Sequence, residues 1–424
     1  MLVSLINIFV IAFSGYALFS SRKKSRDVAF YALALFDTVY VLPLLVELFL
    51  GKALVSSSYV GFTLSANDEV TEILYGCFVI IVELFFFIFL KKSKPFSMPI
   101  VTIAANIQNQ LSKSSVVLFL SVVFLFAPLV LILLSPNPSL YLFDLGAFDM
   151  KKATVSAVDV VYRKAVHLGD FTTLAFISVI ILKIVDKKNK PLYKMLRIFG
   201  IAVIAIANGK RTFVTFLIIV LTMLDFLYGK KKKYLLLNIT VACICLASFF
   251  VAYAYVSGKY ELNTNWYSVI SEYFFRNNSV KVAIYSTLHP DKLHILDYPG
   301  QTLLFDALFF IPRQIWASKP FPFPDYYTSA ILGFSNLTTF GWNFQTNIYA
   351  EFVANLGFIA FFITPAVILF MCKRVNESKG ILEYILGAVF IILIQVFEFS
   401  DMLKVVLVAW LFMIFKKKIK MRSL

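Results

Sequence analysis

Charged residues are scarce in this chain of 424 residues, and their scarcity excludes most soluble folds. Asp, Glu, Lys and Arg together make up 15% of the residues, hydrophobic residues make up 60%, and the mean hydropathy is +0.82. Soluble domains contain about 25% charged residues and about 45–50% apolar ones. A soluble enzyme and a disordered chain are therefore excluded, and lipid is the expected solvent for most of the protein.

Cysteine, histidine and nucleotide-binding motifs are scarce as well. The four cysteines lie in or at the end of apolar runs without zinc-like spacing, so they predict neither a metal site nor a disulfide framework. The three histidines have no fixed spacing, and no Asp-x-Asp pair lies in the expected outer loops. The short basic loops contain neither GxxxxGK[ST] nor GxGxxG. We therefore expect no metal, nucleotide or other cofactor, and an ATP-driven motor is disfavoured.

Long apolar runs predict an all-α polytopic membrane protein. A helix that crosses the bilayer core needs about 20 apolar residues. Eleven runs are candidates, namely 2–20, 28–50, 71–90, 115–134, 168–186, 194–208, 212–228, 235–255, 350–372, 381–398 and 402–415. The short ones, such as 194–208, are expected to tilt or to thin the membrane. The run 302–316 is interrupted by Asp306, Pro312 and Arg313, so we expect a re-entrant or interfacial segment there. The whole chain, 1–424, is expected to form a single integral membrane domain.

Basic residues cluster on every second loop between these runs. The clusters begin at Arg22, Lys91, Lys187, Lys230, Lys373 and Lys416. Because loops rich in Lys and Arg stay in the cytoplasm, this pattern places the N-terminus outside and the C-terminus inside. The net charge of +16 is thus a topology signal and not a sign of nucleic acid. One long outer loop is expected over 256–349.

Five acidic residues fall within or beside the expected spans, where an unpaired charge is costly. They are Asp37, Glu47, Glu83, Asp225 and Glu398. A transporter uses such groups as a proton or ion relay, but no inverted repeat is visible in the sequence. We expect them to pair inside the helix bundle with Ser, Thr, Tyr or Lys.

A basic pair on a tight outer turn is the first candidate for substrate binding. Lys210 and Arg211 follow Gly209 between two expected spans, against the usual charge bias of outer loops. Arg211 lies at the start of the next helix, where the helix dipole favours anions. Its guanidinium can form two parallel hydrogen bonds with a phosphate. The alternative to a phosphate-binding role is that the Arg211 side chain, at a helix end, extends its charged group to the membrane surface without binding substrate.

The long outer loop carries the densest group of candidates. Arg313 and Lys319 are framed by prolines that stiffen the backbone, and Trp316 lies between them. Two cations and an aromatic ring in a stiff segment suit a diphosphate and sugar site. An interfacial anchor for anionic lipid is the alternative, since it needs the same residue types. Asp325 and Arg276, on the same loop, complete the candidate substrate-binding residues.

Three residues are candidates for a catalytic base. Glu351 begins an apolar run, and Asn355 lies one helical turn further on the same face. A carboxylate at the membrane edge beside cations suits a base for a sugar hydroxyl, although an ion pair with a cation is the alternative. His289 and His294 on the long loop are alternative bases, because a neutral imidazole can accept a proton.

The sequence resembles the Wzy-type O-antigen and oligosaccharide repeat-unit polymerases in three places, namely the outer turn 209–212, the loop segment 311–320 and Glu351 with 355–357. The resemblance in topology covers nearly the whole chain, whereas the resemblance in motifs covers only 207–212 and 311–357. It implies a lipid-sugar glycosyltransferase (GT-C-like) fold in the bacterial inner membrane. The implied reaction joins repeat units linked to undecaprenyl diphosphate on the periplasmic face.

By this resemblance, Arg211, Arg313 and Lys319 would hold the diphosphates of the substrates. The related O-antigen ligases carry a catalytic histidine in the long loop, which keeps His289 and His294 as candidates. The implied partners are the lipid-linked oligosaccharide, membrane lipid and a separate chain-length regulator. An O-antigen ligase and a lipid-linked oligosaccharide flippase stay open as alternatives, although flipping does not need so long an outer loop.

Overall fold

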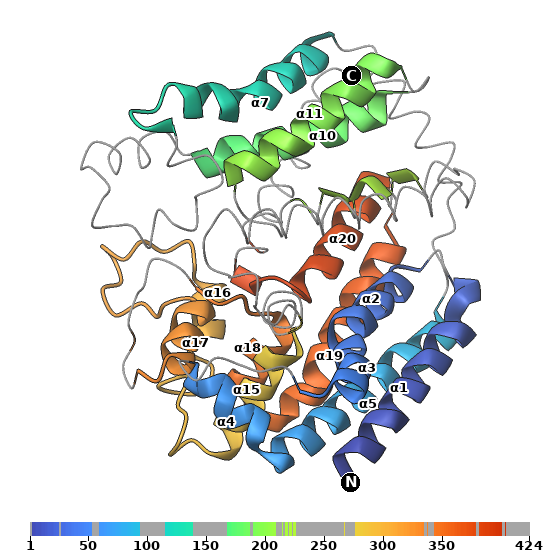
Figure 1. Cartoon of the computed structure of the whole chain (residues 1–424), viewed down its shortest axis with the longest axis vertical. Helices are drawn as coiled ribbons and strands as arrows, with labels where there is room; N and C mark the ends of the chain where they lie inside the picture. Colours follow the sequence, from blue (N-terminus) through green and yellow to red (C-terminus); the bar gives the residue numbers. More distant parts are fainter. Residues whose placement is uncertain are drawn as a thin grey trace. The chain divides into compact units, whose positions relative to one another are not determined.

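The computed structural model describes residues 2–24, 27–52, 59–93, 115–138, 168–186, 190–208, 276–334, 343–378 and 381–400, with scattered residues of 214–225 and Tyr267, Leu337 and Leu403. Every regular element in this part of the chain is a helix (Figure 1). The chain divides into two compact units. The first contains Met1–Ser97 and Asn265–Leu424, and the second contains Met98–Thr264.

The structure confirms a helical membrane protein. Five stretches are long and apolar enough to cross a bilayer, namely Leu2–Lys24, Val28–Leu50, Glu69–Lys92, Ser115–Leu133 and Ile348–Asn376. The runs 168–186, 194–208 and 381–398 also form helices, here α10 (Leu168–Val185), α11 (Pro191–Asn208) and α20 (Ile381–Ile394). The expected span 235–255 lies outside the described residues, and of the expected span 402–415 only Leu403 is described. The total of eleven spans stays a prediction.

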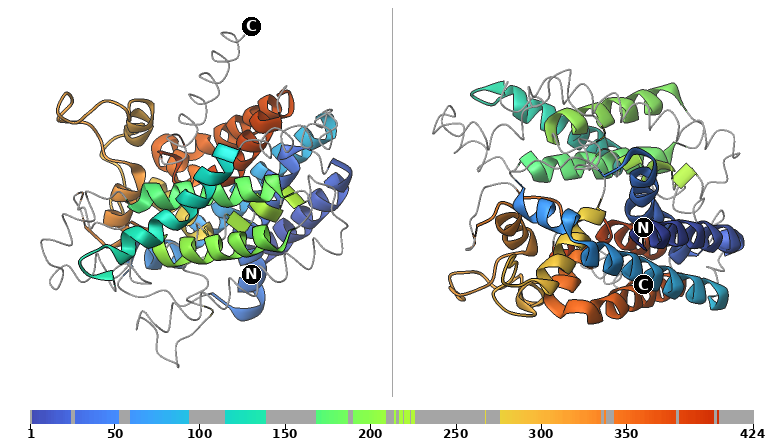
Figure 2. Two further views of the ribbon diagram at one scale, coloured as in Figure 1. Left: turned by 90° about the horizontal axis from the view of Figure 1, so that it is seen from above. Right: turned by 60° about the horizontal axis from the view of Figure 1, so that its bottom comes forward.

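The first unit is built on α1 (Leu2–Ser21) and α5 (Glu69–Lys92), which pack side by side (Figures 1 and 2). α1 buries small side chains such as Ser14 and Ala17, while Phe9 and Phe19 on its other faces are exposed, as in a helix that faces lipid. A Cβ atom on Gly76 of α5 would lie 2.4 Å from Ile6 of α1. Gly76 therefore permits the close approach of the two helices.

The second span is interrupted by a π-helical turn. It consists of α2 (Val28–Phe36), the π-helix η2 (Asp37–Val41) and α3 (Leu42–Leu50). A π-helical turn alters the backbone hydrogen-bond ladder and often marks a functional position. The carbonyl oxygen of Tyr40 accepts a hydrogen bond of 2.8 Å from the hydroxyl of Tyr75 on α5. The hydroxyl of Tyr40 in turn donates to the carbonyl oxygen of Gln395, so this turn ties three helical segments together.

The long-loop region supplies α15 (Asn277–Leu288), α16 (Gln301–Ala307) and α17 (Phe323–Ile331). α18 (Ile348–Leu356) and α19 (Ala360–Asn376) follow, joined by the short helix η4 (Gly357–Ile359). α15 packs against α18, α5 and α4 (Val60–Asn67). α4, α15, α16, α17 and α18 gather on one side of the first unit in Figure 1, and α19 runs beside α2. The short helix α16, followed by turns, agrees with an interrupted 302–316 segment that does not form one continuous span.

In the second unit, α7 (Ser115–Leu133), α10 and α11 pack against one another. Gly200 of α11 makes this packing close, because a Cβ atom there would lie 2.4 Å from Leu125. Lys183 of α10 forms a salt bridge with Asp225. The expected pairing of the buried acid Asp225 with Ser, Thr, Tyr or Lys is thus confirmed, with Lys183 as the partner.

Candidate functional site

The candidate base Glu351 lies in a buried polar cluster between α16 and α18. Its side chain is 1% exposed, and its Oε1 accepts a hydrogen bond of 2.8 Å from the hydroxyl of Thr302. Asn355, one turn further along α18, donates to the same hydroxyl over 2.7 Å and accepts from the backbone N–H of Thr302 over 3.1 Å. The carboxyl group of Asp306 lies beside Glu351, and Glu398 lies within electrostatic range.

This geometry follows from two pairs of residues at helical spacing. Thr302 and Asp306 are four residues apart on α16, and Glu351 and Asn355 are four residues apart on α18, so each pair shares one face of its helix. Gly300, with φ of 80°, adopts the left-handed conformation that glycine favours and leads the chain into α16. Asn347 caps α18 by accepting from the N–H of Ala350.

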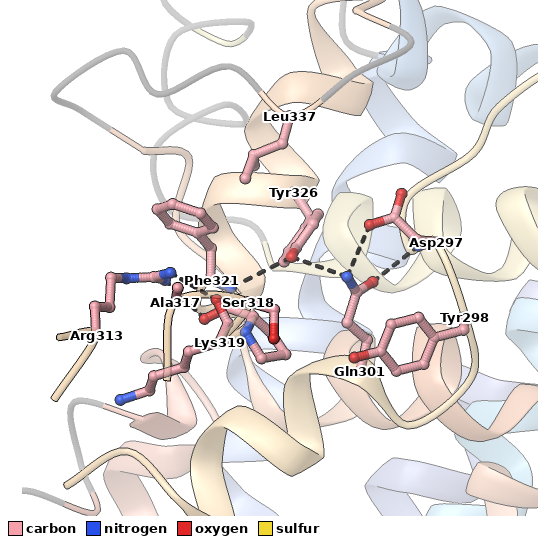
Figure 3. A pocket seen from close by; sticks show the side chains of 11 residues that line it. Asp297, Tyr298, Gln301, Arg313, Ala317, Ser318, Lys319, Phe321, Tyr326 and Leu337 are labelled. Carbon is pink, nitrogen blue, oxygen red and sulfur yellow. Dashed lines mark hydrogen bonds between the residues drawn. The ribbon is translucent and has the colours of Figure 1, made fainter. Parts of the chain in front are cut away.

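An open hollow of about 480 Å³ is lined by Gln301 of α16, by residues of the loop after it and by Tyr326 of α17 (Figure 3), and Glu351 is not among its lining residues. Gln301 lines the hollow, whereas its neighbour Thr302 contacts Glu351. The side chain of Gln301 donates to Asp297 over 2.8 Å and to the hydroxyl of Tyr326 over 2.9 Å. The hollow is therefore lined by hydrogen-bonding side chains with an aromatic ring, Tyr298, at its edge.

Arg313 and Lys319 line the hollow, but their charged groups bind backbone carbonyls of the same loop. Arg313 donates to the carbonyl oxygens of Lys319 and Pro320 over 2.6 and 2.8 Å, and it stacks on Phe321 at 3.7 Å. Lys319 is 7% exposed and donates to the carbonyl oxygens of Phe309 and Ile311. These two cations therefore hold the turns of 309–321 in place, in addition to any part in binding.

The other loop candidates are placed at the margin of this region. Trp316 is half-buried and donates from its indole nitrogen to Ser318 over 3.0 Å. Asp325 accepts a hydrogen bond of 2.7 Å from Asn343. Burial raises the pKa of Asp325, while the bond from Asn343 and the charge of Arg313 act in the opposite direction. Neither residue lines the hollow.

The histidines lie apart from Glu351 and from the hollow. His289 follows the last turn of α15, with its Nε2 3.6 Å from the carboxylate of Asp68 and its ring 4.7 Å from that of Tyr285. Asp68 caps α5, and hydrogen bonds from Thr71 and the nearby His289 lower its pKa although partial burial acts to raise it. His294 is exposed. His289 is thus engaged in a contact between α15 and α5.

A buried ion network on α15 was not predicted as a site. Lys281 is 3% exposed and lies 2.9 Å from Glu72 of α5 and 3.5 Å from Glu47 of α3. Glu72 also pairs with the exposed Lys52 over 3.1 Å, and Asn277 donates to Glu47 over 3.2 Å. The expectation that Glu47 pairs with Ser, Thr, Tyr or Lys is confirmed, with Lys281 as the partner.

Arg276 directly precedes α15 and differs from the other described cations. Its side chain is 5% exposed, and among the described residues it has neither an ion pair nor a hydrogen bond from its guanidinium. Lys210 and Arg211, the remaining predicted cations, lie outside the described residues.

No family model matches the chain, and neither a curated protein nor a solved structure matches it. The fold and the site together therefore define a helical membrane protein in which α16 contributes Thr302 to a buried acidic cluster and Gln301 to an open polar hollow.

Proposed function

We propose that this protein is a membrane glycosyltransferase that polymerises oligosaccharide repeat units carried by undecaprenyl diphosphate. The observation that supports it best is the buried Glu351, positioned by Thr302 and Asn355 beside a second carboxyl group, while Gln301, the chain neighbour of Thr302, lines an open polar hollow. The partners of Glu351 among the described residues are hydroxyl and carboxyl groups and not cations. This favours a proton-accepting role over an ion pair.

The proposed reaction uses these groups as follows. The acceptor sugar hydroxyl gives its proton to the carboxylate of Glu351, and its oxygen attacks the anomeric carbon of the donor sugar. The bond between that carbon and the diphosphate oxygen breaks, and the polyprenyl diphosphate leaves as an anion. Asp306 lies beside Glu351 and can share the proton, as neighbouring carboxyl groups do in other acid–base sites.

The hollow lined by Asp297, Gln301 and Tyr326 suits the hydroxyl groups of a sugar, because its walls offer both donors and acceptors. Tyr298 at the edge offers an aromatic face on which a sugar ring can pack. The exposed apolar side chains of α1 and α7 agree with a protein surrounded by lipid, where the polyprenyl tail of the substrate resides.

Deletion of the gene in the source bacterium tests this function against its alternatives. Loss of a repeat-unit polymerase leaves lipid A core capped with a single repeat unit, and the polymer ladder disappears. Loss of an O-antigen ligase or of a flippase removes even the single capped species. Electrophoretic banding of the surface polysaccharide separates these outcomes, and complementation with the intact gene must restore the ladder.

A further inference from the structure

Arg276 is a buried cation without a counter-charge in the part of the chain that the structure describes. Its Nε atom is fully buried and unpaired, and the groups that act on it electrostatically are the phenols of Tyr40 and Tyr327. Burial lowers its pKa to about 10, with the two tyrosines acting in the opposite direction, so the guanidinium stays protonated at neutral pH. An uncompensated buried charge is costly, which indicates that something else neutralises it.

The surroundings of Arg276 contain further polar atoms without partners. The hydroxyl of Tyr327 on α17 is fully buried and makes no hydrogen bond with the described residues. The same holds for the side-chain oxygen of Asn277, the first residue of α15. Tyr327 can donate to an anion, while Asn277 can accept from a hydroxyl group of the same ligand.

The N-terminus of α15 adds a second source of positive potential. α15 has 12 residues and begins directly after Arg276. The first turn of a helix presents backbone N–H groups without intrahelical partners, and the helix dipole favours an anion there. The hydroxyl of Ser279 is already used, since it donates to the carbonyl oxygen of Arg276 over 2.7 Å and accepts from Asn347 over 2.5 Å. These bonds fix the start of the helix.

We propose that Arg276, the N-terminus of α15 and the hydroxyl of Tyr327 form a binding site for a phosphoryl group. The planar fork of an arginine matches two phosphoryl oxygens, and helix N-termini are general phosphate sites. The phosphoryl group comes either from a polyprenyl phosphate lipid or from free phosphate or diphosphate. The polyprenyl source rests on the proposed function, whereas binding of a phosphoryl group at Arg276 is measured without glycosyl transfer, so either can fail without the other.

Thermal unfolding and equilibrium dialysis of the purified full-length protein in detergent test this site. The probes are inorganic pyrophosphate and undecaprenyl phosphate added to the micelles. A ligand that binds only the folded state raises the unfolding temperature. We expect such a rise in the wild type, with both probes if the site is open to free diphosphate and with the lipid alone if it takes only lipid-borne phosphoryl groups. No rise with either probe overturns the proposal.

Variants of Arg276 give the sharper result. In Arg276→Met, the unfolding temperature without ligand should stay the same or rise, because an unpaired buried charge is removed, and binding should weaken about tenfold or more. Arg276→Lys should keep part of the affinity. Lys292→Gln removes one exposed cation from the loop after α15 and should bind like the wild type. A lower unfolding temperature in Arg276→Met, or equal binding by that variant, contradicts a phosphoryl site.

Discussion

The hydroxyl of Thr302 donates a hydrogen bond to the carboxylate of Glu351 over 2.8 Å, and both side chains are buried. Thr302 belongs to the long-loop region, whereas Glu351 lies in the first helix of a membrane-spanning stretch. This bond therefore joins the loop that borders the hollow to the part of the protein within the bilayer. Because Thr302 also binds Asn355, the carboxylate is held in one orientation.

If Glu351 accepts the proton of the acceptor, Glu351→Gln should lower the rate of polymerisation by about 10²–10⁴, the usual contribution of a general base. Thr302→Val should also impair polymer formation because it releases the carboxylate, and Thr302→Ser should restore it by keeping the hydroxyl. Chain-length profiles of the polysaccharide measure these effects. Glu377→Gln, which removes an exposed carboxylate, is the matched control. Normal chains in Glu351→Gln would exclude this residue as the base.

Arg313 should stabilise the turns of the loop. Replacement by Lys keeps the charge but removes the two-pronged contact with the carbonyls of Lys319 and Pro320. Hydrogen bonds of a charged group contribute about 1.5–3 kcal/mol each, so amide hydrogen exchange over 308–322 should accelerate in Arg313→Lys. Arg374→Lys, at an exposed arginine of α19, should leave that exchange unchanged. Unchanged exchange in Arg313→Lys, together with lost polymer, would assign Arg313 to the substrate and not to the loop.

The ion network around Lys281 should be essential for stability. Lys281→Met leaves Glu47 and Glu72 without their shared buried cation, and removal of one partner from a buried pair costs about 3–5 kcal/mol. The pair of Glu72 with Lys52 offsets part of this loss. Adding Glu72→Gln to Lys281→Met should recover some stability. Lys292→Met, at an exposed lysine, is the control in thermal unfolding, and an equal unfolding temperature in Lys281→Met would refute the network's role.

The same network predicts a direction of pH dependence. Burial lowers the pKa of Lys281, but the stronger combined effect of Glu47 and Glu72 raises it above the usual value. The stability that the ion pairs supply is therefore fully present below the unfolded pKa of about 10.4 and is lost as the pH rises through the folded pKa. The difference in stability between wild type and Lys281→Met should accordingly shrink only at strongly alkaline pH.

The sequence predicted helices over the described apolar runs, five stretches of which are long and apolar enough to cross a bilayer, because a long apolar run needs no tertiary information. It also predicted that Glu47 and Asp225 pair with Ser, Thr, Tyr or Lys, and both pair with a lysine whose position the sequence did not indicate. Lys281 and Glu47 are 234 residues apart in the sequence, so only folding of the chain brings them together. For Glu47 and Asp225 a polar partner was therefore predictable, while its identity was not. The same expectation is not met by Asp37 and Glu83, whose buried carboxylate oxygens make no hydrogen bond with the described residues.

The candidate site was predicted less completely. Arg313 and Lys319 were assigned to a ligand because prolines frame them, yet both bind backbone carbonyls that the turns of the loop expose. Thr302 and Asp306 were missed, although their spacing of four residues on a short helix matches that of Glu351 and Asn355 and was a usable signal. The lack of an ion pair or hydrogen bond at the Arg276 guanidinium depends on all the residues that surround it in the fold, and no sequence pattern predicts that.

Close packing of α1 and α5 should depend on Gly76. In Gly76→Val, the new side chain meets Ile6, from which even a Cβ atom would be only 2.4 Å away. Overpacking costs about 1–3 kcal/mol, so the unfolding temperature in detergent should fall. Gly15→Val in α1 is the matched control, because a Cβ atom at Gly15 meets nothing within 4 Å. Equal loss of stability in both variants would show that helix flexibility, and not this contact, is the cause.

Reconstitution of the purified protein into lipid vesicles tests the proposed polymerase activity most directly. The substrate is the single repeat unit linked to undecaprenyl diphosphate, extracted from the strain that lacks this gene. We expect products of two or more repeats on one lipid diphosphate with the release of free undecaprenyl diphosphate, and no such products from Glu351→Gln. Lipid-linked units that cross the bilayer without growing, or that stay unchanged, would contradict the proposed function.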